Sequence, residues 1–294
     1  MIILTGRVWP VFSALGTTPL SDIQTLSPVI DLDARAAFLE TLIAKAADRA
    51  LQGFLQREEG QLEMKGPQDF LTETDLAVED LIRQEIARTF PEDAILGEEG
   101  GGIPGRATWV IDPVDGTANF ARGVPHFCVI IAFCVDGRCD LGAITNPVLN
   151  ECYFARRGHG ALKNGQPLRV TTTPSASSAC LEMGWSRRLP VETYLEAQRK
   201  VLEEGANIRR GGSGGLALAY VAEGRSDGYF EGIMSSWDCL AGLLMVEEAG
   251  GRIGTWPATL ADLTATGPVL AITPALAYQF AKVLAPVALK ETSA

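Results

Sequence analysis

The sequence contains few of the residues that most often bind transition metals. Among its 294 residues are two histidines and six cysteines. No two cysteines have the C-x-x-C spacing of a zinc site, and two histidines are too few for a histidine-rich metal site or a histidine-based relay. Most of the cysteines lie in apolar runs, which predicts reduced core residues of a cytoplasmic protein.

Positive charge and long apolar runs are also scarce. The chain has 25 basic and 36 acidic residues, a net charge of −11, which disfavours nucleic acid and anionic membranes as partners. No apolar run reaches the roughly 18–20 residues of a membrane span. The first residues lack the basic start of a signal peptide. With 47% hydrophobic residues, the chain can bury the core of one large or two modest domains.

Prolines and composition divide the chain into three parts. Prolines at 10, 19 and 28 interrupt any helix in residues 1–32, so we expect a poorly ordered N-terminal extension there. The Thr- and Ser-rich segment 171–178 is the clearest break in composition. We therefore expect an N-terminal half over 33–172 and a C-terminal half over 173–290.

Hydrophobic periodicity predicts different structures in the two halves. Apolar residues from Leu39 to Phe54 recur at helical spacing, and a second amphipathic helix is predicted over 76–89. Segment 127–170 has the pattern of an antiparallel meander with turns at Asp136-Gly137 and Asn164-Gly165. Strands and helices alternate beyond residue 178, which is typical of an α/β layer.

One acidic segment, Trp109 to Phe120, contains the strongest functional signal. It begins as an apolar strand and continues through Asp112, Pro113, Asp115 and Gly116. Pro113 stiffens the backbone between the two aspartates, and amides after Gly116 can face an anion. Two carboxylates beside an anion site would repel its ligand unless a divalent cation lies between them, and Mg²⁺ binds both carboxylates and phosphate oxygens. The alternative is an ordinary strand-to-turn junction.

Three further acidic residues have both a structural and a functional interpretation. Asp75 lies beside a predicted helix start, where an aspartate commonly caps the helix. Glu98 precedes a glycine-rich stretch that is typical of a solvated loop. Asp238 falls in the first turn of a predicted helix, where it complements the helix dipole.

Together these segments resemble the signatures of the inositol monophosphatase family of magnesium-dependent, lithium-sensitive phosphatases. Residues 112–120 are similar to its DPxDGTxxF motif, residues 97–99 to its GEE element and residues 72–75 to its T-x-T-D motif. Residues 237–251 resemble its second signature, WDxAAGxxLVxEAGG, with Leu240 in place of an alanine. The resemblance covers about 34–285 and implies an α/β (α+β) fold, a layered αβαβα sandwich, and in most members a homodimer.

The resemblance also implies roles for individual residues. Two or three Mg²⁺ ions would be held by Glu98, Asp112, the Val114 carbonyl, Asp115, Asp238 and Asp75. Thr117, bonded towards Asp75, would help to activate the attacking water, and the amides of Gly116 and Thr117 would hold the phosphate. Glu231 matches the glutamate that accepts inositol hydroxyls. Gly214 lies where the family usually has alanine, which predicts a wider or looser substrate pocket.

The implied substrate is a small phosphorylated polyol or sugar, with inositol 1-phosphate first. Histidinol phosphate is the nearest alternative, and fructose 1,6-bisphosphate and 3′-phosphoadenosine nucleotides are hydrolysed by relatives. Segment 227–236 contains no lysine or arginine, which favours monophosphates over bisphosphates. Because some bacterial members resembling this chain bind the transcription machinery, a protein-binding role is a second alternative.

Overall fold

A computed structural model describes residues 30–57, 63–66, 69–284 and 287–291. The chain divides into two units, Met1–Asp31 and Leu32–Ala294, and every element below belongs to the second. The expected disorder of the N-terminal extension falls almost entirely outside the described residues.

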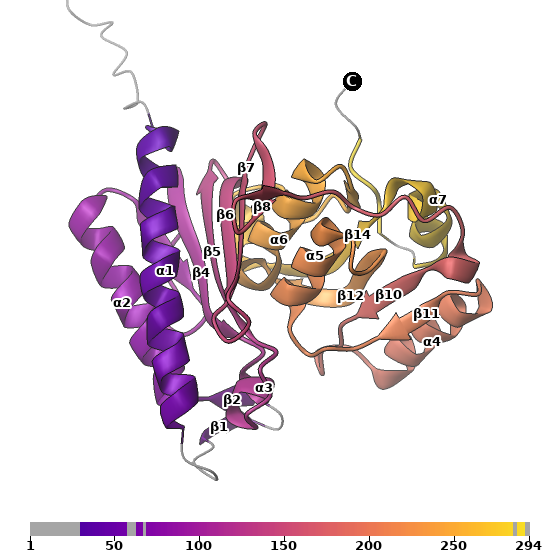
Figure 1. The fold of residues 1–294 in the computed structure, drawn as a ribbon, viewed down its shortest axis with the longest axis horizontal. Helices are drawn as coiled ribbons and strands as arrows, with labels where there is room; N and C mark the ends of the chain where they lie inside the picture. Colours follow the sequence, from indigo (N-terminus) through magenta and orange to yellow (C-terminus); the bar gives the residue numbers. More distant parts are fainter. Residues whose placement is uncertain (1–29, 58–62, 67–68, 285–286, 292–294) are drawn as a thin grey trace, which may run out of the picture. The chain divides into compact units, whose positions relative to one another are not determined.

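Two helices, α1 (Leu32–Gln56) and α2 (Glu73–Thr89), form the first layer. The apolar positions that the sequence spaces at helical intervals are buried in both, from Leu39 to Phe54 in α1 and from Val78 to Ile86 in α2. The two helices pack on each other and on one face of a large sheet (Figure 1). A small antiparallel pair, β1 (Glu63–Gly66) and β2 (Asp69–Leu71), connects them in sequence.

The large sheet has seven strands in sequence order and forms the second layer. Its five final strands are the predicted meander, whose turns at Asp136-Gly137 and Asn164-Gly165 have the positive φ angles of tight hairpins. Only the pairing of β3 with β4 is parallel. The strands are β3 (Ala94–Gly97), β4 (Ala107–Asp115), β5 (Cys128–Val135), β6 (Arg138–Asn146), β7 (Glu151–Arg156), β8 (Gly160–Lys163) and β9 (Gln166–Pro167).

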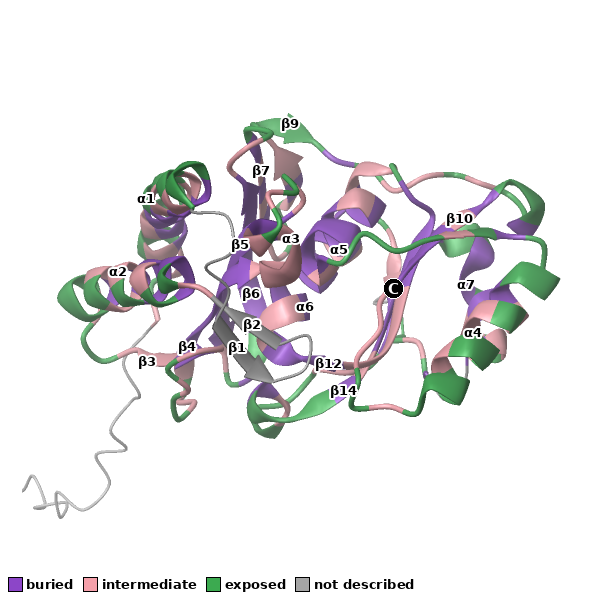
Figure 2. Ribbon diagram, turned by 90° about the horizontal axis from the view of Figure 1, so that it is seen from below, coloured by how far each residue is buried: buried purple, intermediate pink, exposed green. Residues whose placement is uncertain are grey.

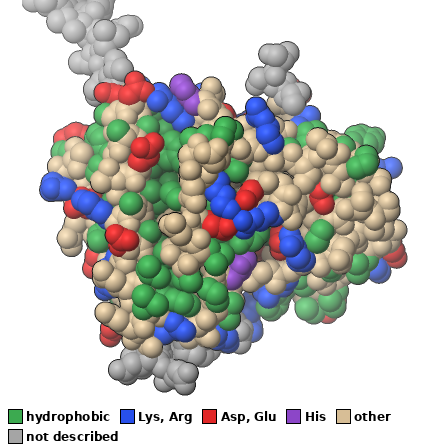
Figure 3. Space-filling model, viewed as in Figure 1, with side chains coloured by type: hydrophobic (Ala, Val, Ile, Leu, Met, Phe, Trp, Pro, Cys, Tyr) green, Lys and Arg blue, Asp and Glu red, His purple; other side chains and the backbone are tan. Residues whose placement is uncertain are grey.

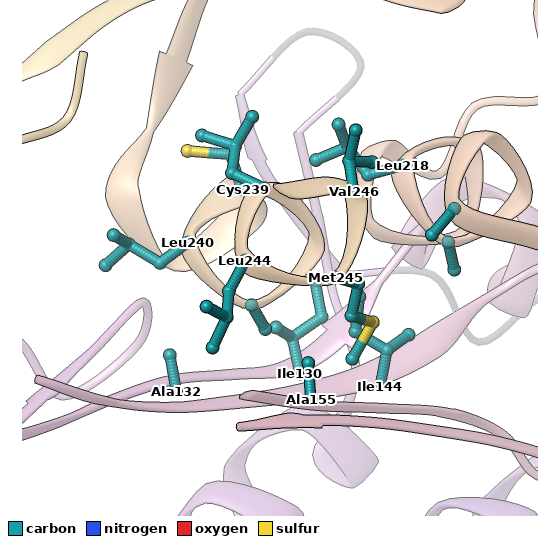
Figure 4. Packing of buried hydrophobic residues seen from close by; sticks show 14 of the residues in the cluster. Ile130, Ala132, Ile144, Ala155, Leu218, Cys239, Leu240, Leu244, Met245 and Val246 are labelled. Atoms are coloured by element: carbon teal, nitrogen blue, oxygen red, sulfur yellow. The ribbon is translucent and has the colours of Figure 1, made fainter. Parts of the chain in front are cut away.

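Helices α5 (Gly214–Glu223) and α6 (Ser236–Glu248) form the middle layer, and α6 contacts strands of both sheets. Because α6 is covered on both sides, its residues from Cys239 to Val246 are all buried. In Figure 4, Leu244 and Met245 point towards the large sheet, whereas Cys239 and Val246 lie on the opposite side of the helix. Gly242 permits close contact with α5, since a Cβ there would lie 2.5 Å from the Leu218 Cβ.

A five-stranded sheet and two outer helices, α4 (Val191–Glu203) and α7 (Pro274–Val283), complete the sandwich. The strand order is β11-β10-β12-β14-β13, and β10 pairs in parallel with both of its neighbours. Figure 2 shows buried residues concentrated on the sheets and on the helix faces that cover them. The strands are β10 (Cys180–Met183), β11 (Asn207–Arg209), β12 (Gly228–Ser235), β13 (Arg252–Ile253) and β14 (Thr266–Ile272).

These layers confirm the predicted αβαβα sandwich. The chain passes from the large sheet to the smaller one between Pro167 and Cys180, across the Thr- and Ser-rich segment. Some bounds differ from those expected. Strand β4 continues through both aspartates of the acidic segment, β12 extends to Ser235, and the strand predicted over 253–256 is only two residues long. Among the described residues, none of the helices combines the length and apolar character needed to cross a bilayer.

Candidate active site

Three carboxylates from separate segments meet between the large sheet and α6. Glu98 follows β3, Asp112 lies in β4, and Asp238 occupies the first turn of α6. One ligand oxygen from each lies within 4.8 Å of the others. This spacing suits a shared cation, because carboxylate oxygens bind Mg²⁺ at about 2.0–2.1 Å.

A bulge in β4 directs both of its aspartates towards the middle layer. In a regular strand, residues three apart lie on opposite faces of the sheet. The pairing of β4 with β5 is interrupted between Asp112 and Asp115, and Pro113, which cannot donate a ladder hydrogen bond, lies within this interruption. Asp112 therefore approaches Asp238 of α6 while Asp115 contacts the start of α5.

Asp115 is held by hydrogen bonds from the start of α5. Its Oδ2 accepts from the Ser213 Oγ at 2.5 Å and from the Gly215 amide at 2.7 Å, and its Oδ1 accepts from the Gly214 amide at 3.2 Å. Burial raises the pKa of Asp115, and these hydrogen bonds oppose that rise. Asp115 is thus fixed beside the three-carboxylate cluster rather than being a member of it.

Asp75 caps α2 and also faces Thr117, which follows β4. The amide and hydroxyl of Thr72 both donate to its Oδ2. The Thr117 hydroxyl donates to the Val114 carbonyl at 2.9 Å and lies 3.4 Å from Asp75 Oδ1. Burial raises the pKa of Asp75 to about 6. A raised pKa makes Asp75 a stronger base than an exposed aspartate.

Asp238 caps α6 in the same way that Asp75 caps α2. Its Oδ2 accepts from the Ser235 amide at 3.1 Å in a capping box. Burial, with the nearby carboxylates of Asp115 and Glu231, raises the pKa of Asp238 to about 7. Burial and the charges of Glu98, Asp115 and Asp238 raise the pKa of Asp112 well above its usual range. A bound cation would relieve this repulsion, so the donor set fits Mg²⁺.

A cavity of about 180 Å³ lies beside these carboxylates. Glu231 lines it and accepts a hydrogen bond of 2.5 Å from the Tyr229 hydroxyl. Burial raises the pKa of Glu231 to about 7. Other lining residues are Asp115, Trp185, Arg210, Ser213, Gly214 and Asp238.

The sequence predicted that Gly214 would leave the cavity wider, but the structure fills the space beside this glycine. A Cβ at this position would lie 2.6 Å from the Cε of Met234 and 3.2 Å from the Tyr229 hydroxyl. Met234 also lines the cavity. Its side chain therefore occupies the space that an alanine methyl would need, which sequence reasoning could not see because β12 is remote from position 214.

The sequence analysis did not predict several contacts of the site. Ser213 belongs to a recognised loop, but its bond to Asp115 joins residues 98 positions apart. Arg188 and Arg210 lie outside segment 227–236, and their positive charges lower the pKa of Glu231 against its burial. Glu79 is buried on α2. The only sign of this in the sequence is that a charged residue lies beside the apolar positions of the helix. By contrast, Arg209 forms an ion pair with Glu182 at 2.9 Å, in keeping with a structural role.

Comparisons with known proteins identify the family of this chain. The family model described as "Inositol monophosphatase family" matches residues 31–288. The chain belongs to this family. An inositol-1-monophosphatase of Rhizobium meliloti is 39% identical to this member over 226 residues, 74% of this chain and 85% of that protein. A protein named Nus factor SuhB from Pasteurella multocida is 37% identical over 235 residues, 78% of this chain and 85% of that one.

Solved structures agree with the family assignment. The extragenic suppressor protein suhB of Bartonella henselae has a TM-score of 0.79 at 31% identity, covering 86% of this family member and 99% of that chain. The inositol monophosphatase of Anabaena has a TM-score of 0.74 at 30% identity, covering 87% and 97%. Both are similar over nearly the whole sandwich.

Proposed function

We propose that this chain is a Mg²⁺-dependent phosphatase that hydrolyses the phosphate monoester of a small polyol, with inositol 1-phosphate as the first candidate. The observation that carries this proposal is the convergence of Glu98, Asp112 and Asp238 within 4.8 Å, beside a cavity lined by Glu231. Family membership supports phosphate-ester chemistry, and the cavity supports a polar alcohol.

The metal-binding roles are those that the family resemblance implies, and three of the residues involved, Glu98, Asp112 and Asp238, converge in the structure. Glu98, Asp112 and the Val114 carbonyl would hold a first Mg²⁺, while Asp112, Asp115 and Asp238 would hold a second. Glu98 and Asp75 would serve a third. Bound Mg²⁺ would neutralise phosphate charge and lower the pKa of water.

We propose that Asp75 and Thr117 act together as the general base that activates the attacking water. Thr72 occupies Oδ2 of Asp75, which leaves Oδ1 for the Thr117 hydroxyl and an incoming water. The Thr117 hydroxyl has one hydrogen, and its shorter contact is with the Val114 carbonyl at 2.9 Å, against 3.4 Å to Asp75 Oδ1. When it donates to Val114, its oxygen and Asp75 Oδ1 can each accept a hydrogen bond from that water. The water can thus be oriented towards phosphate held by the amides of Gly116 and Thr117.

Glu231 would select the alcohol. An ionised carboxylate accepts hydrogen bonds from two neighbouring hydroxyls of a polyol, and it could also hold the amine of histidinol phosphate. The sequence argument against a bisphosphate considered only segment 227–236. Arg188 and Arg210 bring positive charge near Glu231 from other segments, so a bisphosphate is a necessary competitor in the test.

One panel of phosphate-release assays tests the proposal. We expect kcat/KM to be highest for inositol 1-phosphate, lower for histidinol phosphate and lowest for fructose 1,6-bisphosphate and adenosine bisphosphates. Activity should disappear in a chelator and return with Mg²⁺. Full activity in chelator would contradict the metal site, whereas a leading bisphosphate would contradict only the role of Glu231.

A second candidate is a protein-binding role, because several similar proteins carry the name Nus factor SuhB. On the face shown in Figure 3, acidic and basic side chains lie beside one another instead of forming a field of one sign. Pull-down of RNA polymerase subunits, set beside the phosphatase panel, separates this role from catalysis. We also propose a homodimer, for which light scattering after size-exclusion chromatography is the test.

A further inference from the structure

The loop that carries Glu98 is tied to helix α2 by two buried or partly buried charged residues. Glu79 and Arg83 lie one and two turns after Asp75, on the same face of α2. Glu79 is 2% exposed, and a glutamate is rarely buried without partners. Its partners are Arg83 and two amides of the loop 97–101, which begins at the last residue of β3.

Glu79 accepts hydrogen bonds from two consecutive amides of that loop. Its Oε2 accepts from the Glu99 amide at 3.0 Å, and its Oε1 accepts from the Gly100 amide at 2.7 Å. The Arg83 Nε donates to the same Oε1 at 2.8 Å, and an Arg83 terminal nitrogen donates to the Gly101 carbonyl at 2.5 Å. Glu79 thus binds two amides of the loop, and Arg83 binds one of its carbonyl groups.

Each backbone amide from 97 to 101 has a defined acceptor. Gly97 and Gly101 exchange two hydrogen bonds of 3.0 Å, and the Glu98 amide donates to the Ile111 carbonyl of β4 at 3.2 Å. The amides of Glu99 and Gly100 are the two that depend on Glu79. Without its carboxylate both amides would lose this acceptor.

Glycine is required where the loop passes Glu79. A Cβ at Gly97 would lie 2.5 Å from the Glu79 Oε1, and a Cβ at Gly100 would lie 2.6 Å from it. A carboxylate held by three hydrogen bonds has little freedom to withdraw. The glycines beside Glu98 therefore permit α2 to approach the loop closely.

We propose that Glu79, supported by Arg83, is a positioning residue that holds Glu98 in the geometry needed to bind Mg²⁺. This inference rests on the proposed function, because it assigns Glu98 to the metal. Since Asp75 and Glu79 are one turn apart on α2, the same helix sets the position of Asp75 relative to Glu98. Glu79 is not one of the proposed Mg²⁺ ligands and does not line the cavity.

The test is Glu79→Gln, which keeps the shape of the side chain but presents an NH₂ group to one of the three donors. The matched control is Asp80→Asn, which removes a charge from the adjacent, exposed position of α2. Titration calorimetry with Mg²⁺ should show affinity about 10–100-fold weaker in Glu79→Gln and unchanged in Asp80→Asn. In the metal-free protein, amide hydrogen exchange at Glu99 and Gly100 should be faster only in Glu79→Gln.

A second variant and the wild type separate the possible failures. Arg83→Met removes the bond to Gly101 and should weaken Mg²⁺ binding in the same direction but less, and it serves as the test if Glu79→Gln does not fold. A folded Glu79→Gln with wild-type Mg²⁺ affinity would overturn the inference, even if its melting temperature falls. If the wild type itself bound no Mg²⁺, the proposed function would fail instead.

Discussion

Asp75 and Asp238 each combine a structural role as a helix-capping residue with a proposed role in the active site. Each is the third residue of its helix and accepts a backbone hydrogen bond from the residue that caps it. The capping interpretation of Asp75 and its functional interpretation are therefore compatible. The cap uses Oδ2, while Oδ1 of Asp75 remains directed towards Thr117.

Two adjacent glutamates allow a direct test of the metal site. Glu98→Gln removes a charge from the three-carboxylate cluster, so we expect Mg²⁺ affinity and kcat to fall by about 100-fold or more. Glu99→Gln should be comparatively mild, because Glu99 lies outside the three-carboxylate cluster, and its charge is one of the lesser causes that raise the pKa of Asp75. Calorimetry and initial rates check both variants. Equal losses would show that the wrong glutamate has been assigned.

Glu231 predicts a pH dependence of substrate selection. Burial and Asp115 raise its pKa to about 7, against the Tyr229 hydrogen bond and the charges of Arg188 and Arg210. The carboxylate ionises as pH rises through this value, so kcat/KM for inositol 1-phosphate should increase across it. Mg²⁺ bound at Asp238 would move the step below pH 7.

The variant Glu231→Gln should abolish this pH step without removing metal dependence. The control is Glu192→Gln, at an exposed position in the first turn of α4. Profiles of kcat/KM against pH measure the difference. A step that persists unchanged in Glu231→Gln would assign the ionisation to another group.

At the scale of elements, α6 joins the core to the site. Its first turn carries Asp238, and Leu244, two turns later, is 2% exposed and points towards the large sheet (Figure 4). We expect Leu244→Ala to lower the free energy of unfolding by about 2–5 kcal/mol through loss of buried contacts and a residual cavity. Urea unfolding followed by circular dichroism gives this quantity.

An exposed leucine provides the comparison. Leu202 of α4 is 51% exposed, so Leu202→Ala should change the free energy of unfolding by less than about 0.5 kcal/mol. If both variants unfolded at the same urea concentration, α6 would not have the central packing role described above.

At the scale of the whole molecule, the proposed Mg²⁺ ligands join two structural layers. Glu98 and Asp112 come from the large sheet and its loop, whereas Asp238 comes from the helix that contacts both sheets. Mg²⁺ should therefore stabilise the folded chain, by about 2.7 kcal/mol at a concentration 100 times its Kd. Thermal unfolding with and without Mg²⁺ should show a gain that Asp238→Asn largely removes. A melting temperature that does not depend on Mg²⁺ would contradict this expectation.

Lithium inhibition is a separate expectation of the proposed phosphatase activity. The family resemblance implies that Li⁺ replaces one weakly held Mg²⁺. Initial rates at several Mg²⁺ concentrations should fall with added LiCl but not with NaCl at equal ionic strength. Identical responses to the two salts would contradict lithium sensitivity.

The sequence by itself determined the elements and the chemical type of the site. Helical spacing in α1 and α2, Asn-Gly and Asp-Gly turns in the meander, and strand–helix alternation after residue 178 are local patterns, so they could be predicted without tertiary contacts. The resemblance of the acidic motifs to family signatures also pointed to Glu98, Asp112 and Asp238, whose carboxylates lie close together in the structure.

Only the tertiary structure decided which side chains share a space. The bulge at Pro113 rotates Asp112 and Asp115 towards one layer, Ser213 reaches Asp115 across 98 positions, and Met234 fills the space beside Gly214. Glu79 appeared in the sequence as one charged residue beside an apolar stripe, and its role depends on two amides some 20 residues away. Such contacts join segments that are remote in sequence, and their geometry depends on how the layers pack.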